Sequence, residues 1–203
     1  MKRCILAAIR CSLIFTTVAV LFVESAQAYT VTLEQIGSDV VANGSGRINL
    51  TGLTLDQIGT VSAGIAPLGG SIQTGPYLSP VLDFYSGFTG PASFGSGFGG
   101  SAFDGTGDFV GIIASIGLLD VPHGYVSGHF LTDSMTFNQA SLASLGATPG
   151  TYVWTWGTGL PNQNFTLIIE AADVPDGGSA LLLLAVGLFA LMMYPGQSRR
   201  NQA

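Results

Sequence analysis

Two acidic residues lie close together in a short glycine-rich stretch of this sequence. Asp104 and Asp108 flank Gly105-Thr106-Gly107, and this pattern predicts a tight loop that carries two carboxylates. Carboxylate oxygens are preferred ligands of Ca²⁺, although the spacing differs from that of an EF-hand loop. Asp83 or Asp120 could complete such a site. Asp104 and Asp108 are therefore a calcium candidate, with a solvated turn as the alternative.

Two tryptophans form a second candidate site. Trp154 and Trp156 are separated by Thr155, so both indoles fall on one face of a predicted strand. An outward-facing pair would offer a platform on which sugar rings could stack. An inward-facing pair would belong to the core, which is the more usual place for aromatic residues in such a hairpin.

The sequence offers no convincing catalytic group. His123 and His129 fall in a predicted turn and a predicted strand, so they cannot form a helical zinc pair. Residues 95–100 match a dinucleotide-binding glycine pattern, but they neither follow an apolar strand nor open a helix. No Gly-x-Ser-x-Gly elbow is present. We therefore expect no catalytic residue, no cofactor and, apart from the calcium candidate, no metal.

Charge excludes several classes of partner. Between Tyr29 and Val174, the chain has one cation, Arg47, and ten acidic residues, which give a net charge of −9. Such a segment cannot neutralise a phosphate backbone or anionic lipid headgroups, so nucleic acid is excluded as a partner. Cys4 and Cys11 precede this segment, which therefore has no disulfide and no thiolate ligand or nucleophile.

Strands must position these side chains. Tyr29–Glu34 alternates apolar and polar residues, which predicts a strand with one apolar face. Asn43-Gly44, between two apolar runs, predicts a hairpin turn because both residues tolerate positive φ. The further predicted strands are 48–51, 58–66, 81–85, 109–113, 125–131, 151–156 and 165–170. The last two are predicted to pair as a hairpin around the loop 157–164, because aromatic residues on one strand face aliphatic and aromatic residues on the other.

The remaining segments complete the predicted domain. Residues 87–107 are mostly Gly, Ser and Phe, which predicts long loops whose aromatic residues plug into the sheet: Phe88, Phe94, Phe98 and Phe103. Residues 138–145 predict one short helix that ends at Gly146. Short strands separated by turn signals, with both faces partly apolar, favour an all-β fold. We expect an antiparallel, jelly-roll-like β-sandwich over residues 29–173.

The start of the chain has the features of an export signal. Basic residues are followed by an apolar stretch, Cys11–Val23, and then by small residues at Ala26 and Ala28. This order predicts a helical signal peptide over residues 1–28, which signal peptidase cuts between Ala28 and Tyr29.

The end of the chain, residues 174–203, carries a second predicted signal. Val174-Pro175-Asp176-Gly177-Gly178 precedes an apolar run over residues 180–194, and Arg199 and Arg200 follow. As a helix, this run of about fifteen residues would span about 22 Å of the roughly 30 Å of bilayer hydrocarbon. We therefore expect one transmembrane helix, suited to a transient stay in the membrane, with Arg199 and Arg200 as its stop-transfer signal.

This order of motif, apolar helix and arginine pair resembles the PEP-CTERM class of bacterial sorting tails, in its VPDSG-like branch. The resemblance implies cleavage near Val174–Gly178 by an exosortase-type membrane protease. It also implies passage through the inner membrane to the cell surface or extracellular matrix of a Gram-negative-type bacterium. The expected role is non-enzymatic, structural or adhesive, in an exopolysaccharide setting such as a biofilm. The alternative is a carbohydrate- or calcium-binding module that a single-pass helix anchors permanently.

Overall fold

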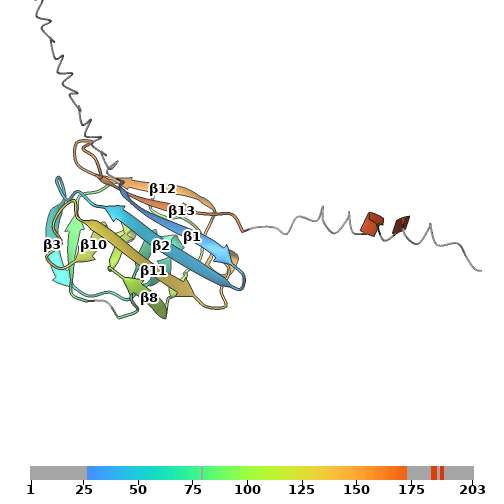
Figure 1. Cartoon of the computed structure of the whole chain (residues 1–203). Coiled ribbons are helices and arrows are strands. Elements are labelled where there is room, and N and C mark those ends of the chain that lie inside the picture. Colours follow the sequence, from blue (N-terminus) through green and yellow to red (C-terminus); the bar gives the residue numbers. More distant parts are fainter. Residues whose placement is uncertain (1–26, 79, 173–183, 187, 190–203) are drawn as a thin grey trace, which may run out of the picture.

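The computed structural model describes residues 27–78, 80–172, 184–186 and 188–189. The part between residues 27 and 172 is all-β and contains two sheets (Figure 1). The first sheet has the order β12 (Gly150–Thr155), β13 (Asn164–Ile169), β1 (Tyr29–Ile36), β2 (Asp39–Arg47), β11 (Phe130–Phe137) and β8 (Asp104–Gly107). The second sheet has the order β3 (Thr54–Gly59), β6 (Leu82–Ser86), β10 (Leu118–Pro122), β9 (Val110–Ile113), β5 (Ser71–Thr74), β4 (Gly64–Ala66) and β7 (Gly100–Ser101).

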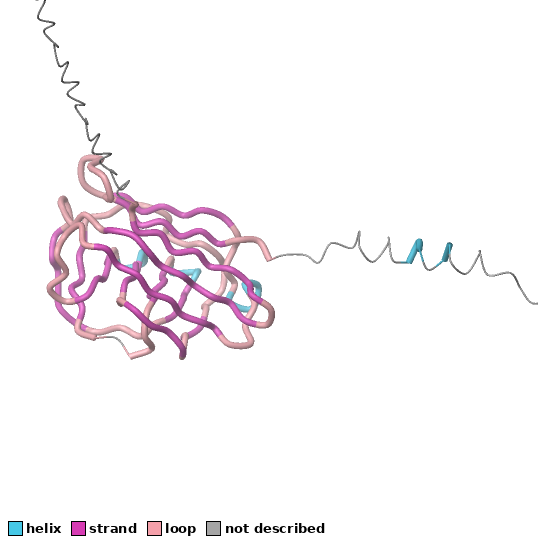
Figure 2. The backbone as a smooth tube through the Cα atoms, viewed as in Figure 1, coloured by secondary structure: helices cyan, strands magenta, loops and turns pink. Residues whose placement is uncertain are grey.

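Helical structure in this part of the chain is confined to single turns (Figure 2). Two 3₁₀ turns, Pro67–Gly69 and Ala114–Ile116, each end at a glycine with positive φ. The predicted short helix is confirmed as α1 (Leu142–Leu145). Ser141 caps its N-terminus, Gly146 ends it in the left-handed region, and both leucines are buried.

Strand β1 lies at the centre of the first sheet. It pairs in parallel with β13, with Tyr29 opposite Phe165, and antiparallel with β2. Its alternating pattern sends Tyr29, Val31 and Leu33 into the core, and none of the three is exposed. The predicted strand at the start of the domain is therefore confirmed, as is the antiparallel pairing of β12 with β13.

The hydrophobic core lies between the two sheets. Buried side chains of both sheets form one continuous cluster, in which Leu33 and Phe165 come from the first sheet and Ile72, Ile112 and Leu119 from the second. The Tyr29 hydroxyl crosses this space and lies 3.2 Å from Thr74 Oγ1 of β5. It also donates a hydrogen bond to the Asp133 carboxylate of β11, so one side chain joins three strands.

The hairpin predicted at Asn43-Gly44 is wrong, because β2 runs straight through these residues. The chain turns instead at Gly37-Ser38, between the paired residues Ile36 and Asp39, where Gly37 has a φ of 62°. Gly44 serves close approach and not a turn: a Cβ there would overlap the Tyr29 hydroxyl and the Asp133 carboxylate. The sequence alone could not show this long-range contact.

Several strand boundaries also differ from those predicted. Residues 48–51 form no strand, and 58–66 divide between β3 and β4. In the segment 125–131, residues 125–129 form no strand and 130–131 begin β11, whereas β10 was not predicted at all. Residues 87–107 contain two short strands, β7 and β8. Among the aromatic residues of this segment, Phe94 is buried, as predicted. Phe98 and Phe103 are exposed and do not insert into the core, contrary to the prediction.

The sorting residues predicted at the ends of the chain fall mainly outside the described residues. This applies to Ala26 and to Val174, Pro175, Asp176, Gly177, Gly178, Arg199 and Arg200. Residues 184–186 and 188–189 of the predicted membrane segment are helical and exposed. Within the described part of the chain, no helix has the length and apolar character needed to span a membrane.

We predict that Gly44→Ala destabilises the fold by about 1–3 kcal/mol, because the new methyl group displaces the buried Tyr29 ring from Asp133 and Thr74. The measurement is urea unfolding of the full chain in detergent, followed by tryptophan fluorescence. Gly100→Ala in the exposed strand β7 is the matched control, since its Cβ meets its nearest neighbour, Leu145, at 3.6 Å. Equal unfolding midpoints for the two variants would contradict the proposed contact.

Candidate functional site

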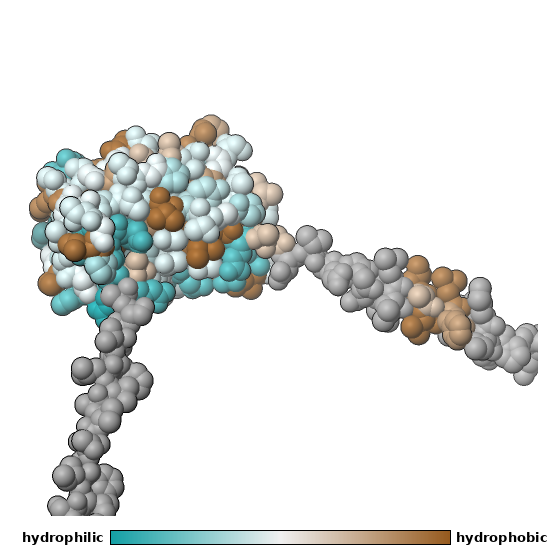
Figure 3. Space-filling view, turned by 90° about the horizontal axis from the view of Figure 1, so that it is seen from above, coloured by the Kyte–Doolittle hydropathy of each residue, from teal (hydrophilic) through white to brown (hydrophobic). Residues whose placement is uncertain are grey.

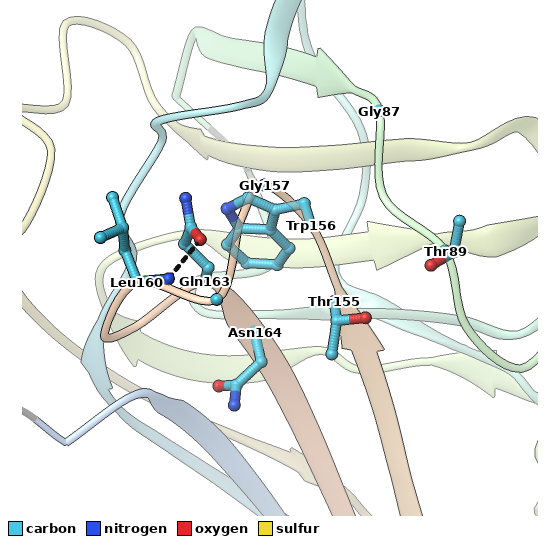
Figure 4. A pocket seen from close by; sticks show the side chains of 9 residues that line it. Gly87, Thr89, Thr155, Trp156, Gly157, Leu160, Gln163 and Asn164 are labelled. Atoms are coloured by element: carbon cyan, nitrogen blue, oxygen red, sulfur yellow. Dashed lines mark hydrogen bonds between the residues drawn. The ribbon is translucent and has the colours of Figure 1, made fainter.

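A polar cleft lies where β12 ends and β13 begins (Figure 4). Its volume is about 510 Å³, within the range of pockets that hold small ligands. We call it the end cleft. Residues from β12, from β13, from the loop between them and from the segment after β6 line it: Gly87, Thr89, Thr155, Trp156, Gly157, Gly159, Leu160, Gln163 and Asn164.

Gln163 fixes the loop that forms one wall of the end cleft. Its side chain is buried, and its Oε1 accepts hydrogen bonds from the backbone N–H groups of Thr158 (3.0 Å) and Leu160 (2.7 Å; Figure 4). Its Nε2 donates to the Thr51 carbonyl at 2.6 Å. One amide therefore satisfies the backbone of the loop and ties it to a distant segment, which gives the wall a defined shape.

Trp156 forms a second part of the wall and is 5% exposed. Its indole Nε1 donates to the Asn49 carbonyl at 2.7 Å. Trp154 is fully buried, donates to the Pro91 carbonyl at 2.9 Å and packs edge-on against Phe94 and Phe165. Both indoles thus face inward, and they do not form the exposed platform considered from the sequence. Only Trp156 borders a space that a ligand could enter.

The opposite wall of the end cleft carries polar side chains. Thr89 and Thr155 exchange backbone hydrogen bonds of 2.9 and 2.8 Å, and their hydroxyls point toward one another across the opening (Figure 4). Asn164 pairs with Thr155 across the strands, and its side-chain oxygen is buried without a hydrogen-bond partner. None of the described residues that line the cleft is charged. The site can donate and accept hydrogen bonds, and it suits a neutral ligand.

Of these residues, only Trp156 was a candidate from the sequence. The segment 157–164 was expected to be a loop, but nothing in it indicated that Gln163 would be buried and organise it. Thr89 and Thr155 are 66 positions apart in the sequence and pair through an isolated β-bridge. No local sequence pattern predicts this pairing. The clustering of Asn, Gln and Gly in the loop was the one available signal.

Asp104 and Asp108 do not form the calcium loop considered from the sequence. The residues between them belong to strand β8, which pairs with β11. Four residues of strand separate the two Cα atoms by about 13 Å. Asp104 accepts a hydrogen bond from Asn138 Nδ2 at 2.8 Å, and Asp108 accepts one from the Thr132 N–H at 2.9 Å. The two carboxylates therefore cannot share one ion, and the alternative of a solvated turn is wrong as well.

The structure brings together one acid–base pair that the sequence did not indicate. His123 Nδ1 lies 2.7 Å from Asp83 Oδ1, and the Gly124 N–H donates to Asp83 Oδ2 at 2.9 Å. Burial acts to raise the pKa of Asp83, but these two hydrogen bonds and the His123 charge lower it below its usual value. The pair fastens the 122–124 turn to β6. Among the described residues, no group of three His, Cys, Asp or Glu side chains is placed to hold a metal.

Two further carboxyl groups are buried in the body of the domain. Asp133 accepts from the Tyr29 hydroxyl, and burial is the main cause that raises its pKa to about 6. Asp120 on β10 is fully buried and neither of its oxygens has a hydrogen-bond partner. Burial raises the pKa of Asp120 to about 8, so this side chain is mainly protonated at neutral pH.

Known proteins add no assignment to this geometry. No family model, no curated protein and no solved structure matches the chain.

We predict that Asp120→Asn removes a pH dependence of stability. The folded state holds the Asp120 proton up to about pH 8, whereas the unfolded chain releases it near pH 4. Stability therefore falls as pH rises between these values, by about 1.4 kcal/mol per pH unit at most. Urea unfolding at pH 5 and pH 9 should show that the unfolding constant of the unaltered chain rises relative to that of Asp120→Asn by up to about a thousandfold, because each of the three pH units between 5 and 8 contributes up to about tenfold.

Asp56→Asn in the exposed strand β3 is the control for this experiment, because it removes a carboxylate that lies at the surface. Its stability profile should run parallel to that of the parent chain. Parallel profiles for Asp120→Asn would show that the buried carboxyl group does not titrate as described.

Proposed function

We propose that this chain is an exported, non-enzymatic surface protein whose ectodomain, a jelly-roll-like β-sandwich, binds neutral saccharides through the end cleft. Its role would be structural or adhesive within an exopolysaccharide matrix. The observation that carries the ligand class is the uncharged lining of the cleft, which combines the hydroxyls of Thr89 and Thr155 and the amide of Asn164 with Trp156. Signal peptidase and an exosortase-type protease would be its processing partners.

The chemistry of the lining supports a saccharide over other small ligands. Sugar hydroxyls donate and accept hydrogen bonds, as do the hydroxyls of Thr89 and Thr155 and the amide of Asn164. An anionic ligand would meet no cation in the described lining and would be repelled by a domain of net negative charge.

The topology supports presentation of the cleft to a surrounding polymer. Asn164, at the start of β13, lines the cleft, whereas Ile169, at the other end of β13, leads toward the C-terminal segment. The five residue steps along this strand place about 17 Å between its ends. A domain that is held or delivered by its C-terminal tail would therefore direct the cleft away from the point of attachment.

We predict that neutral oligosaccharides change the fluorescence of Trp156 on binding to the end cleft. The probes are cellohexaose, maltohexaose and chitohexaose, titrated into the full chain in a detergent that has no sugar headgroup. Thr89→Val and Thr155→Val each remove one hydroxyl while keeping the shape of the side chain. Loss of one hydrogen bond of about 1 kcal/mol should raise Kd about fivefold in each variant.

Thr132→Val is the matched control, because Thr132 is an exposed threonine of β11 that does not line the cleft. It should leave Kd unchanged. No fluorescence change with any of the three hexasaccharides at millimolar concentration would refute saccharide binding at this site.

We also predict that the processed protein begins at Tyr29 and lacks Arg199 and Arg200. Mass spectrometry of the protein from its native host gives both termini in one measurement. Asp176→Ala should retain the tail if the Val174–Gly178 motif is read by a protease, whereas Asp56→Ala in the ectodomain should be processed normally. An arginine pair retained in the unaltered protein would favour the permanently anchored alternative.

A further inference from the structure

A pair of aromatic side chains lies on the surface, away from the end cleft. The rings of Tyr77 and Phe103 have centroids 5.1 Å apart and are inclined at 37°. Tyr77 is 39% exposed and Phe103 is 68% exposed. We call them the aromatic pair. The exposed area of these rings contributes no burial free energy to folding. Contiguous exposed apolar groups commonly mark binding sites.

The fold holds this pair in place through two separate segments. Tyr77 follows β5, in the connection that leads to β6, and Phe103 lies between β7 and β8. The residue before Phe103, Ala102, is buried and its N–H donates to the Ala63 carbonyl at 3.2 Å. The pair is therefore formed by the tertiary structure and does not come from one flexible stretch of chain.

A small hollow adjoins the pair and supplies polar groups. Its volume is about 240 Å³, and it is lined by Thr60, Val61, Ser62, Tyr77 and Leu78. Thr60 and Ser62 are exposed and carry hydroxyls. As at the end cleft, none of the described lining residues is charged. Hydroxyls beside a tilted aromatic surface combine hydrogen bonding with an apolar contact.

We propose that the aromatic pair and its hollow form a second saccharide-binding site. The face of an aromatic ring carries negative partial charge, and one face of a pyranose ring presents several C–H groups with positive partial charge. Stacking of that face on Tyr77 or Phe103 covers apolar area, while Thr60 and Ser62 meet the equatorial hydroxyls. The ligand class is a neutral saccharide with a C–H-rich face, as in the β-linked glucans.

The position of this site makes the chain bivalent. Tyr77 lies before the start of β6, whereas Gly87 of the end cleft follows its end. The two ends of this five-residue strand lie about 13 Å apart. One domain can therefore hold two polymer segments and cross-link them. This last step rests on the proposed function of the end cleft, whereas the aromatic site stands on its own observations.

The face of the molecule in Figure 3 shows apolar residues as separate patches on a mostly pale, weakly polar surface. The exposed Phe98 is one apolar residue that lines neither the hollow nor the end cleft, and it is 86% exposed. Phe98→Ala is therefore a matched control for loss of an exposed phenylalanine. If the polymer bound exposed aromatic rings nonspecifically, Phe98→Ala and Phe103→Ala would weaken its binding equally.

The test compares Tyr77→Ala, Phe103→Ala, their combination and Phe98→Ala with the unaltered full chain in a detergent without sugar headgroups. Retardation in gels that contain hydroxyethyl cellulose reports binding to a soluble β-glucan, and light scattering of mixtures with the same polymer reports cross-linking. The double variant should bind at least tenfold more weakly at this site and should no longer cross-link. Phe98→Ala should behave as the unaltered chain, and unfolding midpoints should agree among all variants.

The outcomes separate this site from the end cleft. Should the double variant bind and cross-link normally while Thr155→Val weakens both, the aromatic site is refuted and the end-cleft function stands. Should the aromatic variants lose binding while Thr155→Val and Thr89→Val keep it, the aromatic site stands and the end-cleft function fails. A concentration-dependent association of the unaltered chain that the double variant abolishes would make the pair a chain–chain contact and overturn the inference.

Discussion

The hydroxyl of Tyr29 is a buried polar group that links the two sheets. This side chain is fully buried, donates to Asp133 in its own sheet and lies 3.2 Å from Thr74 of the other sheet. Burial, followed by the charge of Asp133, raises the pKa of the tyrosine well above its usual value, so the hydroxyl keeps its proton and remains a donor. Gly44 leaves the space that this arrangement requires. The predicted leader cleavage would make this same tyrosine the first residue of the exported protein, so the domain is fixed from its first residue onward.

The scarcity of cations shapes the rest of the interior. With Arg47 as the one cation between residues 29 and 172, most carboxylates cannot be paired with a lysine or arginine. The structure instead gives Asp133 a phenol and Asp83 an imidazole and a backbone N–H. Asp120 receives neither, and burial keeps it protonated. A neutral carboxyl group avoids most of the desolvation penalty of a buried charge, which explains how such a residue is tolerated in the middle of a sheet.

Local pattern predicted those parts of the fold whose partners are close in sequence. The hairpin of β12 and β13 follows from alternating aromatic and aliphatic residues, and α1 follows from Leu142, Leu145 and the terminating Gly146. The pattern failed where glycine served a distant contact. Gly44 resembles a turn residue until the Tyr29 ring is placed beside it, and Asp104 and Asp108 resemble a loop until β11 pairs with the residues between them. The end cleft was hidden for the same reason, since Thr89 and Thr155 meet only in the folded chain.

Each of the two proposed binding sites would bind a single sugar segment only weakly, and this weakness suggests how the two sites would work together. Both are open hollows with neutral hydrogen-bonding groups and one or two aromatic surfaces, so each exchanges contacts with water for similar contacts with a ligand. Net gains per hydrogen bond are then only about 1 kcal/mol, and a single sugar segment would bind weakly. A polymer changes this balance, because occupation of one site raises the effective concentration of nearby segments at the other. A domain with few charges, no cysteine and two separated neutral sites is therefore better suited to hold a hydrated polymer network than to retain a small molecule.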